Sequence, residues 1–304
     1  MRIVSLLPSA TEIACALGLD SELVGISHSC DAPALAELPR VTRTAIPPAA
    51  PSRTIDSAVR AARERGGSLY EVEPELLRAL EPDLVLTQNL CDVCAVGEAE
   101  VTTALQAACL APAVLTLGPR TVAETWDSIR AVAQAAGRAE EARSLIAGLE
   151  ARVAQVAADA RAASRRPRVV FLEWIDPPIV GGHWNPELVE LAGGLDVLGI
   201  AGAPSRTVSW GDVVASRPDV LCLACCGFTE ERTRADLPLL LHQPGIRDLP
   251  CVREGRIEVF DGVGLFSRPG PRLVDSLERL AAVLLPQAFP GWASGSSPTR
   301  SGMT

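Results

Sequence analysis

A stretch of 25 residues in the middle of the sequence, 139–163, contains almost no residue that interrupts a helix. Its apolar side chains at Leu145, Leu149, Val153 and Val156 recur every three or four positions, which predicts one helix with a single apolar stripe. At 1.5 Å per residue such a helix is about 37 Å long, roughly the span of a small domain. A surface helix or a coiled-coil arm would have the same pattern. Its place between two blocks of different texture favours a rigid connector between two lobes.

Both flanking blocks alternate short apolar runs with amphipathic segments, the pattern of parallel strands joined by crossover helices. In the first block we expect strands at 2–7, 23–27, 83–87 and 114–117, helices at 10–17, 55–65, 73–80, 98–109 and 121–136, and a surface loop at 40–55. In the second block we expect strands at 169–174, 219–224 and 257–260 and helices at 186–192, 212–216 and 271–285. The predicted fold class is α/β, with two Rossmann-like lobes joined by a long, rigid backbone helix.

The same pattern divides the 304 residues into four segments. These are an N-terminal lobe at 1–118, connecting helices at 119–165, a C-terminal lobe at 166–290 and a disordered tail at 291–304. The tail is polar and cannot form a core of its own. Each of the two lobes is long enough to bury a hydrophobic core.

The charge balance argues against one large class of partner. The chain has 28 basic and 37 acidic residues, a net charge of −9, so it lacks the basic surface that nucleic-acid binding requires. No apolar run approaches the ~20 residues of a membrane span, and we expect no direct insertion into a membrane. Every basic residue is arginine, which excludes chemistry through a Schiff-base lysine.

The N-terminal residues and the cysteines predict a cytoplasmic location. The first apolar run is interrupted by Ser5 and followed by Pro8 and Glu12, so it reads as a strand and a helix rather than a secretory signal. The nine cysteines are an odd number without the spacing of a disulfide framework, which favours a reducing compartment.

Residues able to carry chemistry follow the predicted strands, where parallel α/β sheets bind their ligands. In the first block these are His28, Cys30, Asp31, Cys91 and Cys94, and in the second Glu173, Trp174, His183, Trp184, Cys225, Cys226, Phe266, Ser267 and Arg268. The tryptophans can form a flat ligand face or belong to the core. His183 follows paired glycines and has either a ligand-binding or a plain structural role. The third histidine, His242, is interpreted as structural.

The pair Cys91-x-x-Cys94 has three interpretations: a metal site, a redox pair or simple packing. No second such pair occurs, so a four-thiolate site would need Cys30 and Cys226 from other strand ends. The phosphate-binding loop, the nucleophile elbow and the zinc-protease helix motif are all absent, and no hydrolase triad can be assembled. Whether the chain is an enzyme stays open, with a binding role favoured.

Several segments resemble one family over about residues 1–286. The opening "RIVSLLPSATEIACALGL" with "LVGISHSCDAP", the segment "PDLVLTQ" and the long central helix are similar to the helical-backbone substrate-binding proteins of cobalamin and iron–siderophore ABC importers. The segments "LCDVCAV", "LEWIDPP", "GGHWNPELVELAGG" and "FSRPGPRLVD" resemble its cobalamin-binding subgroup. The resemblance implies a class III periplasmic-binding-protein-like fold that clamps its ligand between two lobes.

The resemblance also implies a ligand and a set of site residues. Cobalamin, or a related metal chelate, would lie between Trp174 and Trp184, with His183 as an axial ligand of cobalt. The expected ligand-binding residues are Asp31, Glu173, Trp174, His183, Trp184, Phe266, Ser267 and Arg268. Importer-docking members of the family use one surface glutamate per lobe. Here Glu75 matches the first, but Gly211, beside Asp212, replaces the second, so we do not expect ordinary delivery to an importer.

The cysteines support a second hypothesis. On this fold Cys30, Cys91, Cys94 and Cys226 are expected to point into the same cleft, where they would hold Zn or an iron–sulfur cluster. The chain would then be a cytoplasmic metalloprotein or a metal-dependent enzyme. Glu173, His183 and Arg268 would supply acid/base and anion-binding groups.

Overall fold

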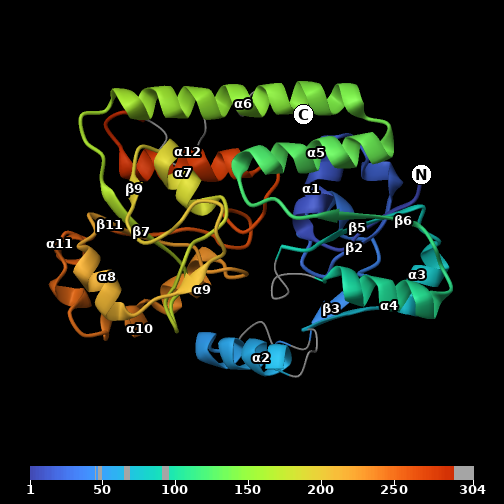
Figure 1. Cartoon of the computed structure of the whole chain (residues 1–304), viewed down its shortest axis with the longest axis horizontal. Coiled ribbons are helices and arrows are strands. Elements are labelled where there is room, and N and C mark those ends of the chain that lie inside the picture. Colours follow the sequence, from blue (N-terminus) through green and yellow to red (C-terminus); the bar gives the residue numbers. More distant parts are fainter. Residues whose placement is uncertain (45, 47–49, 65–68, 91–95, 291–304) are drawn as a thin grey trace. The chain divides into compact units, whose positions relative to one another are not determined.

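The computed structural model describes residues 1–44, 46, 50–64, 69–90 and 96–290, and it divides into two compact units. Unit 1 comprises Met1–Pro119 and Ala123–Ala147, and unit 2 comprises Arg120–Val122 and Gly148–Thr304. The boundary falls inside one continuous helix, α6 (Ala139–Ala162), which Figure 1 shows along its whole length. The predicted pair of α/β lobes joined by a long helix is therefore confirmed.

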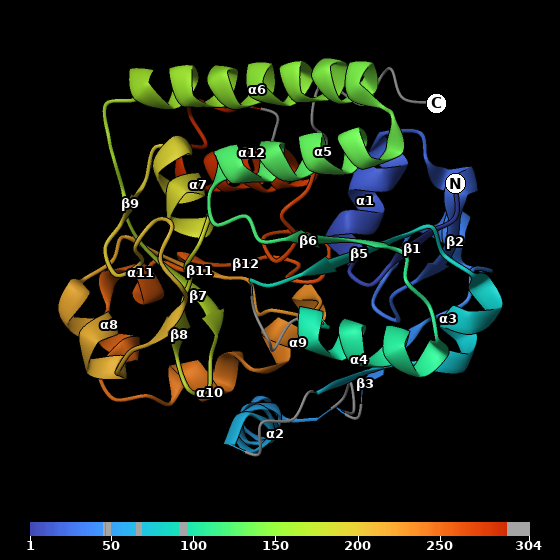
Figure 2. The same cartoon turned by 45° about the vertical axis from the view of Figure 1, so that its right-hand side comes forward.

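Unit 1 is built on a four-stranded sheet in the order β2-β1-β5-β6, in which all neighbours run parallel. Its strands are β1 (Ile3–Ser5), β2 (Leu23–Ile26), β5 (Leu84–Gln88) and β6 (Ala113–Leu117). Its helices include α1 (Pro8–Ala16), α3 (Pro74–Leu80), α4 (Glu98–Ala108) and α5 (Val122–Ala136), with short 3-10 turns at Asp20–Glu22 and Pro33–Leu35. Helices α1 and α5 lie on one face of the sheet, and α3 and α4 lie on the other (Figures 1 and 2).

The segment expected as a surface loop contains a strand. Strand β3 (Thr42–Thr44) pairs antiparallel with β4 (Tyr70–Val72), and α2 (Ser52–Glu64) occupies part of the connection between them. The sequence of β3 is Thr-Arg-Thr, which has no apolar alternation, so only its distant partner strand reveals it. Strand β3 places Thr42 in contact with His28.

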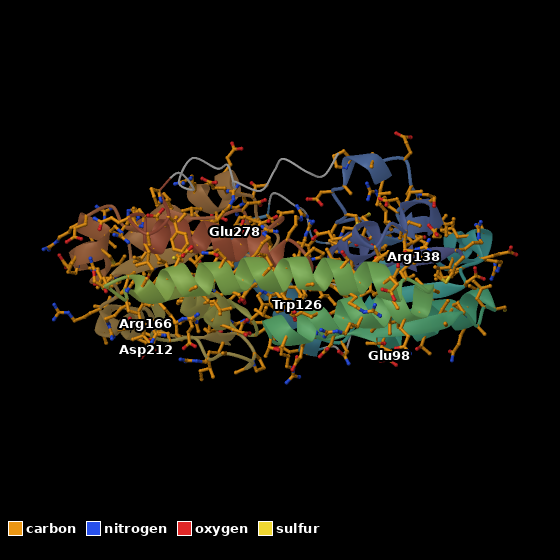
Figure 3. The ribbon with its side chains drawn as sticks, turned by 90° about the horizontal axis from the view of Figure 1, so that it is seen from above. Glu98, Trp126, Arg138, Arg166, Asp212 and Glu278 are labelled. Atoms are coloured by element: carbon orange, nitrogen blue, oxygen red, sulfur yellow. The ribbon has the colours of Figure 1, made fainter. Side chains whose placement is uncertain are left out.

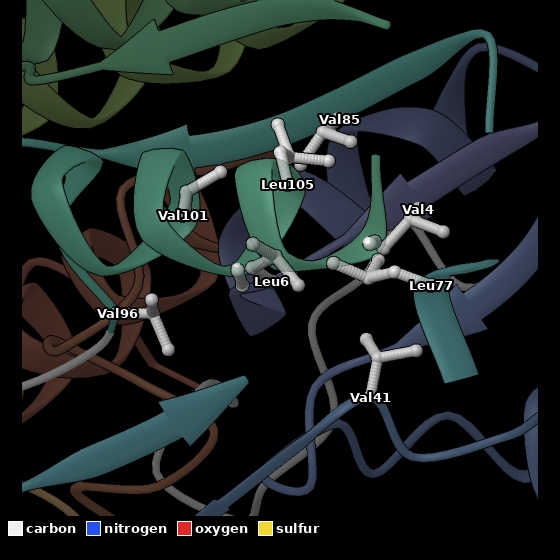
Figure 4. Close-up of a cluster of buried hydrophobic side chains, with 10 residues drawn as sticks. Val4, Leu6, Val41, Leu77, Val85, Val96, Val101 and Leu105 are labelled. Carbon is white, nitrogen blue, oxygen red and sulfur yellow. The ribbon is translucent and has the colours of Figure 1, made fainter. Parts of the chain in front are cut away.

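The core of unit 1 includes a cluster of buried aliphatic side chains beneath α4 (Figure 4). Val4 and Val85 come from neighbouring strands, and Leu77, Val101 and Leu105 come from α3 and α4. Deleting one such buried side chain typically costs ~2–5 kcal/mol of stability. The cluster therefore stabilises the packing of α3 and α4 against the sheet of unit 1.

Unit 2 contains a six-stranded sheet in the order β10-β8-β7-β11-β12, with β9 also pairing to β7. The predicted strands are β7 (Arg168–Trp174), β11 (Val220–Leu223) and β12 (Ile257–Val259), which run parallel. Three two-residue strands were not predicted: β8 (Ile179–Val180), β9 (Leu195–Asp196) and β10 (Arg206–Thr207). Elements this short carry no periodicity, so only their pairing to β7 and to each other defines them.

The helices of unit 2 lie on both sides of this sheet. They are α7 (Asn185–Leu191), α8 (Trp210–Ser216), α9 (Glu230–Ala235), α10 (Leu237–Leu241), α11 (Pro250–Arg253) and α12 (Leu273–Leu284), with a 3-10 turn at Ile246–Asp248. Helices α7 and α12 lie together on one side, opposite α8 and α10 (Figure 2). Among the described residues, no helix is long and apolar enough to cross a membrane.

Helices α1 and α7 each begin before the predicted residues 10 and 186. Helix α1 begins at Pro8 with Leu7 at the N-cap, so Ser9 lies inside the first turn. Proline suits this position because the first helical N–H groups have no intrahelical partner. In the same way Asn185 is inside α7, and Trp184 occupies its N-cap.

Ion pairs attach α6 near its middle and just before its first residue. In unit 2, Arg152 contacts Glu278 at 2.8 Å and Asp275 at 2.6 Å, both on α12, and these contacts raise the pKa of the guanidinium. In unit 1, Arg138, just before α6, contacts Glu22 at 3.0 Å. Figure 3 labels Glu278 and Arg138 along the helix. Paired charges therefore anchor the two halves of the connector to different units.

Candidate functional site

The loop between β8 and α7 in unit 2 presents His183. This histidine has a left-handed backbone conformation, with φ of 52°, which is uncommon for a residue with a side chain. The His183 N–H donates to the Ala203 carbonyl at 2.6 Å, and the Gly202 N–H donates to the His183 carbonyl at 2.8 Å. Two backbone hydrogen bonds therefore hold the histidine in a conformation that costs energy, a common feature of functional positions.

The carboxyl of Glu173, at the end of β7, accepts hydrogen bonds from the same loop. Its Oε1 accepts hydrogen bonds from the Gly182 N–H at 3.3 Å and the Asn185 amide at 2.7 Å, and its Oε2 lies 2.6 Å from the Ser205 hydroxyl. Burial raises the pKa of this carboxyl, against the opposing effect of the hydrogen bonds. Glu173 was predicted to bind the ligand. In the structure its carboxyl connects the loops at 181–185 and 203–205, and we call this arrangement the Glu173 clamp.

Gly182 completes the clamp because no other residue fits there. A Cβ atom at this position would collide with the backbone of residues 203–205. The close approach of the two loops therefore depends on the absence of a side chain. It is this approach that allows the backbone hydrogen bonds on either side of His183.

The surroundings of His183 favour the neutral form of its imidazole. Burial lowers its pKa below the usual 6.5, and the positive charge of Arg120 lowers it further. The segment containing Arg120 belongs to unit 2, where the Val122 N–H donates to the Glu187 carboxylate at 2.8 Å. The ring has no hydrogen-bond partner among the described residues and lies 5.7 Å from the Trp184 ring. A neutral, partly buried imidazole of this kind can donate a lone pair to a metal.

The aromatic side chains predicted to form a flat ligand face lie in the core of unit 2. Trp174 is 8% exposed, packs 4.8 Å from Phe228 and donates its N–H to the Asp176 carbonyl. Trp184 is 5% exposed and donates its N–H to the Phe266 carbonyl at 2.6 Å. Phe266 is 1% exposed between two other phenylalanines. The indole N–H groups of both tryptophans are hydrogen-bonded and little ring surface is exposed, so both rings are packing residues of unit 2 in this structure.

The remaining predicted ligand-binding residues are placed in different surroundings. Ser267 is partly buried and follows Phe266, and Arg268 is 5% exposed. Asp31 is exposed and belongs to unit 1, in the loop after β2. The structure therefore brings together Glu173, Trp184 and Phe266 around the His183 loop, through the hydrogen bonds described above.

The loop after β2 in unit 1 contains a second histidine, which the sequence placed among the strand-end residues able to carry chemistry without assigning it to the ligand. His28 is partly buried, its Nδ1 lies 2.7 Å from the Thr42 hydroxyl, and its ring lies 5.6 Å from Tyr70. Burial, followed by the charge of Arg40, lowers the pKa of His28. The missed signal was Thr42, because its strand was read as a loop.

The cysteine hypothesis finds no support in the described part of the chain. Cys91 and Cys94 lie outside the described residues. Cys30 is 7% exposed in unit 1, with its Sγ 3.1 Å from the Thr11 hydroxyl, and Cys226 is partly buried in unit 2. Within 1–44, 46, 50–64, 69–90 and 96–290, no three His, Cys, Asp or Glu side chains form a group able to hold a metal ion. Cys225 is buried, which raises its pKa to about 12 and keeps the thiol protonated.

Comparison with known families decides the relationship of the chain. A family model described as periplasmic binding protein matches residues 3–262. The chain belongs to this family. Among curated proteins it is similar to the vitamin B12-binding protein of Vibrio cholerae, with 26% identity over 287 residues, covering 93% of this chain and 88% of that protein. It is also 25% identical to an uncharacterized ABC transporter substrate-binding lipoprotein of Bacillus subtilis, covering 95% and 81% of the two chains.

Solved structures of this family have the same fold. The apo periplasmic heme-binding protein of Roseiflexus sp. RS-1 superposes with a TM-score of 0.68 and 26% identity, covering 95% of this chain and 99% of that one. The periplasmic vitamin B12-binding protein of Vibrio cholerae gives a TM-score of 0.66 at 22% identity, covering 95% and 98%. The family predicted from the sequence motifs is confirmed.

The two positions matched to docking glutamates differ in their surroundings. Glu75 lies in the first turn of α3 with its side chain 83% exposed, and it pairs with Arg78 of the same helix at 2.6 Å. Gly211 has no side chain. Its neighbour Asp212 accepts hydrogen bonds from the Ser209 N–H and hydroxyl in the capping box of α8, which lowers the pKa of Asp212. Asp212, labelled in Figure 3, is therefore already engaged in its own helix.

Proposed function

We propose that the protein binds a macrocyclic metal chelate, with cobalamin the expected ligand, and that His183 is an axial ligand of the metal. The observation that carries this proposal is the neutral imidazole of His183, held in a left-handed conformation by backbone hydrogen bonds and by the Glu173 clamp. A left-handed backbone conformation costs free energy, and proteins retain such conformations mainly where the position of the side chain is functionally important.

The number of ligands favours a chelate over a free ion. A zinc or iron ion bound by side chains alone needs three or four of them. A corrin or porphyrin brings four nitrogen donors of its own, so one imidazole is enough. This agrees with the absence, among the described residues, of any metal-holding group of three or more side chains.

The relatives support a ligand of this class. One is named a vitamin B12-binding protein, and a structure of the same fold with 26% identity is named a heme-binding protein. In both ligands a tetrapyrrole macrocycle holds a metal with an axial position that an imidazole can occupy. Cobalamin is the expected ligand because the vitamin B12-binding relative matches over 93% of this chain.

Titration of the full-length protein with aquocobalamin tests this function. We expect the visible absorption bands to shift as imidazole replaces the cobalt-bound water, and we expect His183→Ala to abolish that shift. His242 provides the matched control, because it is an exposed histidine whose Nδ1 contacts the Pro238 carbonyl at 2.6 Å, far in the sequence from both loops. His242→Ala should titrate like wild type. Binding without a His183-dependent shift would refute the axial role.

The cellular setting is a separate proposal. The cysteine content favours a cytoplasmic location, which fractionation of the native organism tests. In place of the expected second docking carboxylate the chain has Gly211, with Asp212 engaged in a helix cap, so we propose that the chelate is not delivered in the usual way to an importer. Loss of importer-dependent uptake on Glu75→Gln would contradict this.

The cysteine alternative makes a different prediction about metal content. A Zn or iron–sulfur site would give near-stoichiometric metal in anaerobically purified protein, lost on Cys91→Ser or Cys94→Ser. A metal-free protein that takes up cobalamin would leave the chelate hypothesis as the account of the site.

A further inference from the structure

Arginines of unit 2 gather where the parallel strands of its sheet begin. Strands β7, β11 and β12 run parallel, so all three start at the same end of the sheet. The segments that lead into them, 161–168, 216–219 and 253–256, contain seven of the 28 basic residues of the chain and only two acidic ones. Six of these arginines are exposed, and we call them the basic patch: Arg161, Arg165, Arg166, Arg168, Arg217 and Arg253. The net charge of −9 predicted no basic surface, and the fold corrects that prediction locally.

Hydrogen bonds hold the three segments side by side. The Asp219 N–H donates to the Arg168 carbonyl at 2.7 Å, and the Arg168 guanidinium donates to the Ser216 carbonyl at 2.8 Å. The Leu221 N–H donates to the Arg256 carbonyl at 3.0 Å. The arginines therefore belong to one continuous surface that spans the starts of three neighbouring strands.

Carboxylates neutralise only part of this charge. The ion pairs of the patch join Arg165 to Asp219 at 3.2 Å, Arg166 to Glu190 at 3.9 Å and Arg253 to Asp248 at 2.7 Å. Glu254 adds one more exposed carboxylate. Within residues 96–290, Arg161, Arg168 and Arg217 form no ion pair. The patch therefore keeps an excess of positive charge.

The basic patch is separate from the candidate site. Arg168 is the first residue of β7, and Arg166, labelled in Figure 3, lies just before it. Glu173, which holds the loop of His183, lies at the other end of the same strand. Parallel sheets bind small ligands at the carboxyl ends of their strands. A chelate beside His183 therefore does not account for these arginines.

The composition of the patch indicates the kind of partner. In the part of the chain that the structure describes, the exposed large hydrophobic side chains are Met1, Val114, Ile200 and Leu239, and none of them lies in the three segments. Protein interfaces usually centre on apolar or aromatic side chains of this kind. The segments also contain no aromatic residue on which a nucleic-acid base could stack. Anionic lipid headgroups need neither, because a cluster of exposed basic side chains is enough to bind them.

We propose that the basic patch binds the anionic headgroups of a phospholipid membrane, without insertion of the chain. The acidic remainder of the chain does not prevent this, because at physiological salt a charge acts over only about 8 Å. The proposal is independent of the proposed function, since it concerns the opposite end of the strands.

Co-sedimentation of the full-length protein with lipid vesicles tests the proposal. We expect binding to mixed vesicles of phosphatidylglycerol and phosphatidylcholine, and none to phosphatidylcholine alone. Binding should disappear at about 1 M salt, where the screening length falls to about 3 Å. The combined variant Arg161→Gln, Arg165→Gln and Arg217→Gln should bind about 100-fold more weakly, because each arginine near an anionic surface contributes about a fivefold factor.

A matched control removes the same charge elsewhere. Arg130→Gln, Arg143→Gln and Arg234→Gln together replace three exposed arginines that each pair with a carboxylate of their own helix. This variant should bind the mixed vesicles like wild type, and thermal unfolding establishes that both variants are folded. Equal loss in the two variants, or no binding of wild type at low salt, would overturn the proposal. Binding to duplex DNA or to poly-glutamate without binding to the vesicles would assign the patch to another class of partner and would overturn it as well.

Discussion

The two histidine loops reach the same chemical state by different routes. In unit 2, the His183 backbone adopts a left-handed conformation, and a buried carboxyl and a glycine hold its loop. In unit 1, the side chain of Thr42 holds the His28 ring. Burial lowers the pKa of both imidazoles, each beside an arginine. The comparison teaches that a neutral imidazole can be fixed by its main chain or by its ring, and that different substitutions should release each one.

Gly182→Ala should have the largest effect, and only on the unit 2 loop. The added Cβ meets the backbone of residues 203–205, and such overpacking costs about 3 kcal/mol of unfolding free energy. The matched control is Gly148→Ala inside α6, where a Cβ meets nothing within 4 Å and alanine should stabilise the helix by up to ~1 kcal/mol. Urea unfolding measures both, and equal effects would contradict the clamp.

Glu173→Ala should have the second-largest effect on the free energy of unfolding. It leaves the Gly182 N–H, the Asn185 amide and the Ser205 hydroxyl without their acceptor, at a cost of about 2 kcal/mol. His183-dependent ligation of aquocobalamin should weaken together with stability. Glu173→Gln keeps the size and the hydrogen-bonding capacity, and we expect it to restore both. If the alanine variant bound like wild type, the clamp would have no part in positioning His183.

Thr42→Val should have a smaller effect on stability, about 1 kcal/mol, because one buried hydroxyl network is removed and the volume is kept. Its effect should be confined to unit 1, so the His183-dependent spectral shift with aquocobalamin should persist. Loss of that shift would mean that the two loops are not independent.

The pH dependence of stability should give the smallest effect, because it comes from a proton rather than a lost side chain. The pKa of Glu173 is raised above its ordinary 4.5, so the folded protein retains a proton that the unfolded chain has released. Stability therefore falls as the pH rises from about 4.5 through the raised pKa. Glu173→Gln should flatten this part of the profile, measured as urea midpoints at pH 5 and pH 8.

Two controls make that pH measurement specific. Burial also raises the pKa of Asp196, so Asp196→Asn should remove a separate part of the same slope. Thr42→Val does not titrate and should leave the slope unchanged. Profiles of wild type and Glu173→Gln that run parallel between pH 5 and pH 8 would show that Glu173 is ionised in the fold.

The sequence predicted those strands and helices that have a clear hydrophobic pattern of their own. Strands β1, β5 and β11 are runs of apolar residues, and α6 has a continuous apolar stripe, so local pattern was enough. Strands β3 and β8 are defined by pairing with distant segments, and neither has a pattern of its own. For this reason the sequence missed Thr42, the residue that orients His28.

The sequence singled out candidate site residues, but it could not show how their side chains are arranged. His183 was singled out by its paired glycines, and the structure explains one of them, Gly182, by a close backbone approach. The sequence left Trp174 and Trp184 as either a ligand face or core residues, because sequence position cannot tell which side of a strand or loop a ring occupies. Both rings are buried with satisfied N–H groups.

The visible absorption spectrum of the full-length protein during titration with aquocobalamin tests the central claim most directly. We predict saturable binding with a band shift typical of imidazole on cobalt, present in wild type and His242→Ala and absent in His183→Ala. No spectral change with wild-type protein at micromolar cobalamin, or the same shift in all three proteins, would contradict it.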